Sequence, residues 1–164
     1  MMREKRLLQW DRLELRIGGE RLVAVAKAIL AGRNIPVELE AIRFLHDDAE
    51  VTGAVRKGLS IPFRFHLGAI EAEGLTVRIP IERLTVLGFV PVPSLLFRLA
   101  EGFASVDGVE IDPARKTIVL ALDRFLPEFL DVEIIAVRPV AGGMLVTLGG
   151  GGADLPPDFG GLHG

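Results

Sequence analysis

The sequence predicts an α+β fold in which a strongly curved, mainly antiparallel β-sheet wraps around one central helix at residues 92–104. Three observations predict this fold. Apolar and polar residues alternate over long stretches between Ile35 and Glu82, as they do in strands with one buried face. Residues 92–104 are apolar around most of a helical circumference, which indicates burial on more than one side. Alternation resumes from Val109, which supplies further strands to close the sheet.

The N-terminal part predicts a strand followed by a second helix. Leucine and isoleucine alternate with charged residues at 13–17, and Gly18 and Gly19 end this strand. Residues 20–31 favour a helix, because alanines are frequent and the aliphatic residues fall on one helical face. A β-hairpin that turns on the two glycines is the alternative that the pattern leaves open.

The strand pattern changes phase once, between Leu39 and Ile42. One extra residue in a β-bulge produces such a slip, so we expect a bulge there. Residues 46–48 and 57–58 predict turns, since Asp and Gly favour them.

The next two strands permit a prediction of register. Apolar faces must lie on the same side of a sheet, so odd positions must oppose odd ones. A loop over residues 71–73, followed by Gly74 in a left-handed conformation, predicts that Phe65 faces Ile79. In the same register Leu67 faces Val77, and His66 faces Arg78 on the polar side.

The C-terminal half predicts strands at 109–111, 117–122, 132–137 and 144–148. Four consecutive glycines and two prolines follow, a composition typical of flexible segments. We therefore expect a single domain over residues 1–148 and a flexible tail over 149–164.

Composition argues against most enzyme chemistry. Hydrophobic residues make up 49% of the 164 residues, and there are no cysteines and no tyrosines. Three serines, five threonines, one asparagine and one glutamine leave few neutral polar groups to orient a polar substrate. The net charge of −3 does not indicate the basic surface that nucleic-acid binding needs. We expect neither enzymatic activity nor a cofactor or metal.

The polar residues that could carry chemistry have simpler interpretations. His46 beside Asp47 and Asp48 is expected to form a solvated turn, because no second histidine has the spacing of a metal ligand. His66 falls on the polar side of its strand, which predicts an exposed or cross-strand-paired histidine. Ser94 suits a position near a helix start and lies in no nucleophile motif.

The apolar residues give the strongest functional hypothesis, since long strands and the enclosed helix carry large aromatic and aliphatic side chains. They predict the lining of a groove for an apolar ligand, and a filled core and a homodimer interface are the alternatives. The expected lining residues are Phe63, Phe65, Ile79, Phe89, Leu96, Phe97, Leu99 and Phe103.

The first ten residues combine positive charge with apolar side chains, which indicates a possible peripheral contact with an anionic lipid surface; the residues concerned are Arg3, Lys5, Arg6 and Trp10. An ordinary frayed strand explains the same residues. No apolar segment is long enough for a signal peptide or a membrane span, so we expect a cytoplasmic protein.

Three late segments resemble the tubular lipid-binding (TULIP) superfamily, and in particular its small bacterial LmeA-like and YceB-like members. They are residues 109–122, Leu126-Pro127 and residues 131–148, which follow the hairpins of residues 35–82. The resemblance implies a rolled sheet that encloses a helix and a lipid, with apolar rather than catalytic residues around the ligand. The expected function is therefore non-enzymatic binding of a lipid or another long apolar molecule in a groove between sheet and helix. The alternative is a structural protein whose apolar surface forms a homo-oligomer or membrane contact.

Overall fold

Antiparallel strands make up most of the structure, a computed structural model that describes residues 6–32, 35–57, 59–86, 92–104 and 106–154. Two short helices accompany them in this part of the chain, α1 (Gly19–Gly32) and α2 (Val92–Phe103). The strands are β1 (Arg6–Trp10), β2 (Leu13–Gly18), β3 (Val37–Leu45), β4 (Asp48–Lys57), β5 (Leu59–Leu67), β6 (Glu71–Glu73), β7 (Thr76–Val86), β8 (Val109–Asp112), β9 (Thr117–Ala121), β10 (Leu130–Asp131), β11 (Ile134–Val140), β12 (Gly143–Leu148) and β13 (Gly151–Asp154).

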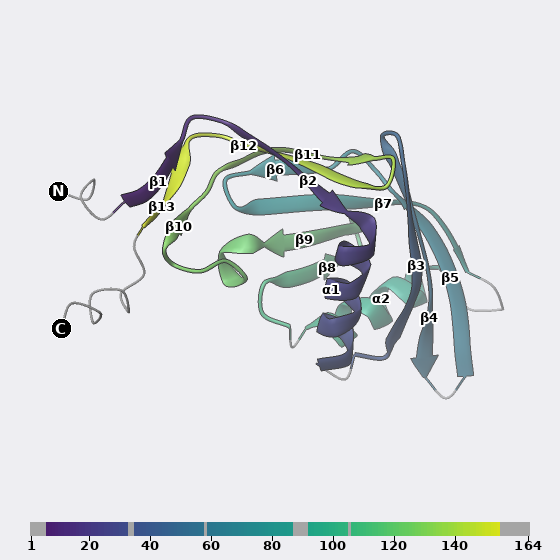
Figure 1. The fold of residues 1–164 in the computed structure, drawn as a ribbon. Helices are drawn as coiled ribbons and strands as arrows, with labels where there is room; N and C mark the ends of the chain where they lie inside the picture. The colour runs from purple at the N-terminus through teal and green to yellow at the C-terminus, as the bar shows by residue number, and fades with distance from the viewer. Residues whose placement is uncertain (1–5, 33–34, 58, 87–91, 105, 155–164) are drawn as a thin grey trace.

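The strands form three sheets. The largest has seven strands in the order β3-β4-β5-β7-β9-β8, with β6 paired to β7. A three-stranded sheet, β11-β12-β2, lies across one end of it (Figure 1). A small sheet, β1-β13-β10, joins the two ends of the described chain.

One face of the seven-stranded sheet carries two cores. The first core lies between this face and the helices and consists of Leu39, Val51, Val55, Phe63, Phe65, Ile81, Leu96, Leu99 and Ile111. The second core lies under the β11-β12-β2 sheet and consists of Val77, Ile134 and Leu148. Because Val77 and Ile81 are four residues apart on β7, they share one face of the strand but belong to different cores.

The predicted wrapping of a curved sheet around a central helix is wrong. No sheet is strongly curled, and α2 packs at one end of the sheet, against β8 and β7 and below the β11-β12-β2 sheet (Figure 1). Length gives the physical reason. The eleven residues of β7 extend over about 36 Å, whereas the twelve residues of α2 extend over about 18 Å. A single helix is too short to cover this face, so α1 and a second sheet share it.

Several predictions of local structure are confirmed. Residues 20–31 lie in α1, which excludes the hairpin alternative. The phase slip is a bulge, because the β3–β4 register shifts between Leu39 and Ala41. Residues 46 and 47 form a turn with Asp47 at φ 55°, and Gly74 has the predicted positive φ of 62°.

The predicted register between β5 and β7 is wrong by four residues. Leu67 lies opposite Ile81, and His66 lies opposite Glu82. Residues 71–73 are not a loop, because they form β6 and pair with the start of β7. The chain therefore turns between β6 and β7, at Gly74 and Leu75, rather than between β5 and β7. The parity argument holds next to the turn, where Leu67 opposes Ile81, but the register shifts between Arg64 and His66, and beyond the shift Phe63 opposes Val86.

The predicted flexible tail is wrong for residues 151–154, and residues 155–164 lie outside the described part. Residues 151–154 form β13 between β1 and β10. The glycines permit close packing of these three backbones. A Cβ on Gly151 would clash with the Asp131 carbonyl oxygen, and one on Gly152 would clash with that of Leu8. In this sheet glycine allows another backbone to approach.

Substitution of Gly152 tests this interpretation. We expect Gly152→Ala to lower the free energy of unfolding by about 1–3 kcal/mol, the usual range for overpacking, because the new methyl group meets a backbone oxygen. Urea denaturation measures this change. Gly150→Ala is the matched control, since a Cβ there has no neighbour closer than 3.8 Å. Equal stability of the two variants would contradict the packing role of β13.

Candidate functional site

Helix α1 covers β3 incompletely. None of its fourteen residues is buried. Val23, Ala26 and Leu30 contact the first core but stay partly exposed. Protein interiors are normally close-packed, so a helix of this kind leaves apolar surface open along its contact with the sheet.

Two cavities flank α1. The larger, of about 990 Å³, lies where β2 passes into α1, and we name it the α1–β3 groove. Residues 16–21 and Val23 line one side, residues 40–44 of β3 line the other, and Gly142 closes it. The smaller cavity, of about 380 Å³, lies at the other end of α1 and includes residues 35–39 and Arg56.

The groove forms because β2 and α1 on one side and β3 on the other are in contact near Gly19 and separate from there. The Gly19 N–H donates a hydrogen bond of 2.8 Å to the Gly142 carbonyl oxygen, which ties the start of α1 to the β11–β12 turn. The Phe44 ring also lies against Gly19, where a Cβ would come within 2.7 Å of the ring atom Cδ2. Beyond this contact Ile17, Val23 and Ile42 provide the apolar lining between β2, α1 and β3.

The bulge in β3 shapes the opposite wall. Leu39 pairs with Gly53 and Ala41 pairs with Thr52, which leaves Glu40 as the extra residue. The Thr52 hydroxyl donates to the Ala41 carbonyl oxygen at 3.4 Å. Because β3 is an edge strand, the bulge exposes Glu40 and Ala41 at the groove.

Charged side chains surround this apolar lining. Arg16, Arg21 and Arg43 come from β2, α1 and β3, and Glu20 and Glu40 lie among them. Within the described part of the chain, the recorded ion pairs include none of these five residues. Arg43 lies opposite Glu50 in the β3–β4 register, so its side chain lies on the face of the sheet away from α1. The groove therefore combines an apolar lining with exposed charged residues of both signs at its edge.

The lining residues predicted from sequence lie elsewhere. Phe63, Phe65, Leu96 and Leu99 are buried in the first core, where the two phenylalanine rings stack with centroids 5.9 Å apart. Ile79 packs on the second core and Phe103 on the first. Phe89 and the side chain of Phe97 lie outside the described part.

None of the described predicted residues lines the groove. Sequence reasoning missed the groove residues, although two signals mark them. One is the phase slip in β3 and the other is the glycine pair after β2.

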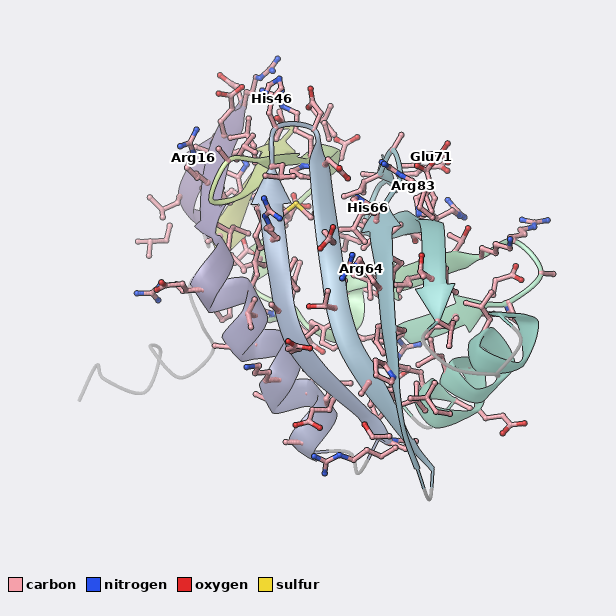
Figure 2. The ribbon with its side chains drawn as sticks, turned by 90° about the vertical axis from the view of Figure 1, so that its right-hand side faces the viewer. Arg16, His46, Arg64, His66, Glu71 and Arg83 are labelled. Carbon is pink, nitrogen blue, oxygen red and sulfur yellow. The ribbon has the colours of Figure 1, made fainter. Side chains whose placement is uncertain are left out.

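A polar cluster lies on the opposite face of the seven-stranded sheet, around His66 (Figure 2). His66 Nδ1 lies 3.1 Å from both carboxylate oxygens of Asp48. Its Nε2 lies 3.3 Å from Glu50 Oε2. The side chain of His66 is 17% exposed. Each ring nitrogen of His66 therefore faces a carboxylate.

A second bulge adds an arginine to this cluster. Two residues of β7, Arg83 and Leu84, stand opposite Phe65, because the register shifts between Arg64 and His66. Arg83 has φ 50°, which is uncommon for a residue with a side chain. The bulge turns Arg83 outward, where its guanidinium lies 3.8 Å from Asp48 Oδ2.

The cluster links three strands rather than surrounding a cavity. Its residues belong to β4, β5 and β7, and neither cavity beside α1 includes them. This agrees with the predicted cross-strand pairing of His66, although its partners are Asp48 and Glu50 rather than Arg78. His46 forms the expected solvated turn, 79% exposed and 3.1 Å from Asp47. Among the described residues, no group of three His, Cys, Asp or Glu side chains could hold a metal ion.

The N-terminal residues proposed for membrane contact are engaged within the protein where the structure describes them. The Arg6 guanidinium lies 3.0 Å from Asp131 and 3.4 Å from Asp154. The Trp10 indole N–H donates to the Gly149 carbonyl oxygen at 3.1 Å. Arg3 and Lys5 lie outside the described part. None of the described helices is both long and apolar enough to cross a membrane.

Fold and groove together define a mainly antiparallel β protein with an open apolar groove beside one helix. Comparisons with protein-family models, with curated proteins and with solved structures give no match to this chain. The functional argument therefore depends on the groove and on the residues around it.

The Asp48–His66 pair makes a prediction about pH. The hydrogen bond from His66 lowers the pKa of Asp48 below its ordinary value of 3.8. A carboxyl group whose pKa is lower in the folded than in the unfolded chain stabilises the fold fully above the unfolded value, and this contribution is lost as the pH falls through the folded value. We expect Asp48→Asn to lower the free energy of unfolding near neutral pH by about 1 kcal/mol.

This difference should shrink as the pH falls below 3.8, and urea denaturation at each pH measures it. The control is a double-mutant cycle with His66→Gln. Asp48→Asn should cost less in that background, because the main partner of the carboxylate is gone. A cost that is independent of both pH and His66 would contradict the assignment.

Proposed function

We propose that the protein binds a lipid or another long apolar molecule, without transforming it, in the α1–β3 groove. The observation that carries this proposal is the apolar lining left open between α1 and β3. The groove volume of about 990 Å³ is at the upper end of the range of about 300–1,000 Å³ for small-molecule sites. Each Å² of apolar surface that a ligand removes from water contributes about 25 cal/mol, so an acyl chain gains most from this lining.

The proposal moves the ligand from the place that the sequence predicts. The large aromatic residues of the first core are already covered by one another, and they are not available to a ligand. Support for a non-catalytic role comes from the His66 cluster, which faces away from the groove and occupies both ring nitrogens with carboxylates.

Blocking the groove tests this function. Gly18 lines the groove, and a Cβ there meets no atom within 4 Å, so we expect Gly18→Trp to add its side chain at the groove without displacing the backbone. We expect purified protein to bind the neutral fluorophore N-phenyl-1-naphthylamine, and dodecanol to displace it. Gly18→Trp should weaken the affinity for the fluorophore and the affinity for dodecanol by about tenfold each, a loss of about 1.4 kcal/mol.

Gly150→Trp is the matched control, because that glycine is exposed and distant in the fold from the groove. Thermal denaturation of both variants checks that they fold. Native mass spectrometry of protein purified from cells should also detect a bound acyl compound in the wild type and less in Gly18→Trp. Equal probe binding by both variants, or no binding by the wild type, would refute the function.

A second candidate function is self-association through β1. This strand lies at the edge of the β1-β13-β10 sheet, and its Leu7 and Leu8 are 63% and 59% exposed. An exposed apolar edge strand is a template for pairing with another chain. The same strand in a second copy is the simplest partner, since homodimers commonly use one surface twice.

Light scattering distinguishes this candidate. If β1 forms the interface, the wild type is a dimer at micromolar concentration and Leu7→Lys shifts it toward the monomer, because a charge at an edge strand opposes pairing. Glu14→Lys on β2 is the control for added charge. A monomeric wild type would exclude the interface and leave the groove function untouched.

A further inference from the structure

Strand β2 presents a regular open edge of the β11-β12-β2 sheet. It lies at the end of this sheet and pairs with β12 from Leu13 to Gly18 without a register shift. In the described part of the chain, the backbone hydrogen bonds recorded outside helices and strands include none from residues 13–17. The N–H and C=O groups on the outer side of β2 therefore form a regular row that another strand can extend.

The other outermost strands of the three described sheets lack this regularity. β1, β3 and β11 each contain a register shift, and β8 and β10 have only four and two residues. Bulges and short strands are common means of protecting sheet edges from association. β2 has six residues and no proline, so it lacks these protections.

The sequence of β2 is complementary to itself in one antiparallel register. Residues 13–17 read Leu-Glu-Leu-Arg-Ile. When two copies pair about Leu15, Glu14 lies opposite Arg16 of the second copy. Unlike charges then meet on one face, and apolar residues meet on the other. A shift by two residues places Glu14 opposite Glu14 or Arg16 opposite Arg16, which is unfavourable, so charge selects the register about Leu15.

The side chains of β2 are exposed enough to make these contacts. Leu15 is 43% exposed, although Leu13 on the same face of the strand packs on the second core. Glu14 and Arg16 lie on the other face, and Arg16 lies on the side of β2 away from the seven-stranded sheet (Figure 2). Among the described residues, the recorded ion pairs give Glu14 only Arg12, at 3.7 Å, and give Arg16 none. A second β2 would cover Leu15 and bring an opposite charge to both Glu14 and Arg16.

We propose that the protein forms a symmetric dimer in which β2 pairs antiparallel with β2 of a second copy, about a two-fold axis at Leu15. The two β11-β12-β2 sheets then become one continuous sheet. Because a two-fold dimer uses the same surface of both copies, the Glu14–Arg16 contact occurs twice. This inference is independent of the groove function, and it uses a different strand from the β1 candidate.

Charge reversal on β2 tests the inference. Sedimentation velocity should show a wild-type dimer at micromolar concentration. Glu14→Arg and Arg16→Glu should each raise the dissociation constant about tenfold, because each places like charges opposite each other at two symmetric positions. An equimolar mixture of the two variants should form a heterodimer of wild-type affinity, since the positive charges of one β2 then face the negative charges of the other. The double variant Glu14→Arg, Arg16→Glu should dimerise by itself for the same reason.

Arg115→Glu, in the exposed turn between β8 and β9, is the matched control for a charge reversal and should leave the dimer intact. Thermal denaturation checks that each variant folds. Glu14→Lys, which leaves a β1 dimer intact, should dissociate this one. A monomeric wild type would overturn the inference, and so would a mixture that fails to associate. A dimer that Leu7→Lys dissociates and Glu14→Arg does not would also overturn it and would assign the interface to β1.

Discussion

One apolar face of the seven-stranded sheet has to be covered by two different kinds of partner, and the rest of the structure follows from this constraint. The face is too long for one helix, so α1 and α2 cover one end and the β11-β12-β2 sheet covers the other. The chain passes from the β11-β12-β2 sheet to the helices at Gly18 and Gly19, where β2 ends and α1 begins. The α1–β3 groove lies at this passage because a strand and a helix diverge from their common point.

The two bulges serve the same face in different ways. Each inserts one residue into a strand whose apolar side must stay inward, and each thereby turns an extra polar residue outward. In β3 the extra residue is Glu40, at the groove. In β7 the bulge turns Arg83 toward Asp48, so that the outer surface gains an ion-pair network while Leu84 still packs on the first core. A β-bulge thus keeps the apolar residues of its strand in the core and adds a polar residue to the surface.

The sequence predicted those features that depend on periodicity. The alternation located most strands and marked the bulge in β3, because one buried face requires a period of two residues; for residues 20–31 the pattern favoured a helix but left a hairpin open. Parity between β5 and β7 was correct at Leu67 and Ile81, but the bulge in β7, which the sequence did not predict, reverses it beyond Arg64. The register was wrong because parity permits every even shift, and pairing of residues 71–73 with β7 selected another one. The central helix was wrong because periodicity does not report how much of a face each partner covers.

The glycines after Leu148 illustrate a second limit. Composition treats a run of glycines as a chain without packing, since glycine has no side chain to bury. In the structure the missing Cβ is the reason for packing, because the carbonyl oxygens of Leu8 and Asp131 occupy the positions where side chains would be. Whether a glycine loosens a segment or permits close contact depends on a partner strand elsewhere in the chain.

The candidate site was missed for a related physical reason. Hydrophobicity selects the largest apolar side chains, such as Phe63 and Leu96, but these contribute most to stability when the protein itself covers them. A surface that is to bind an apolar ligand must remain uncovered after folding, so it is found where regular packing stops. In this chain such places are a glycine pair and a slip in strand phase, and both are visible in the sequence. Interruptions of the apolar pattern are therefore a better guide to the groove than the pattern itself.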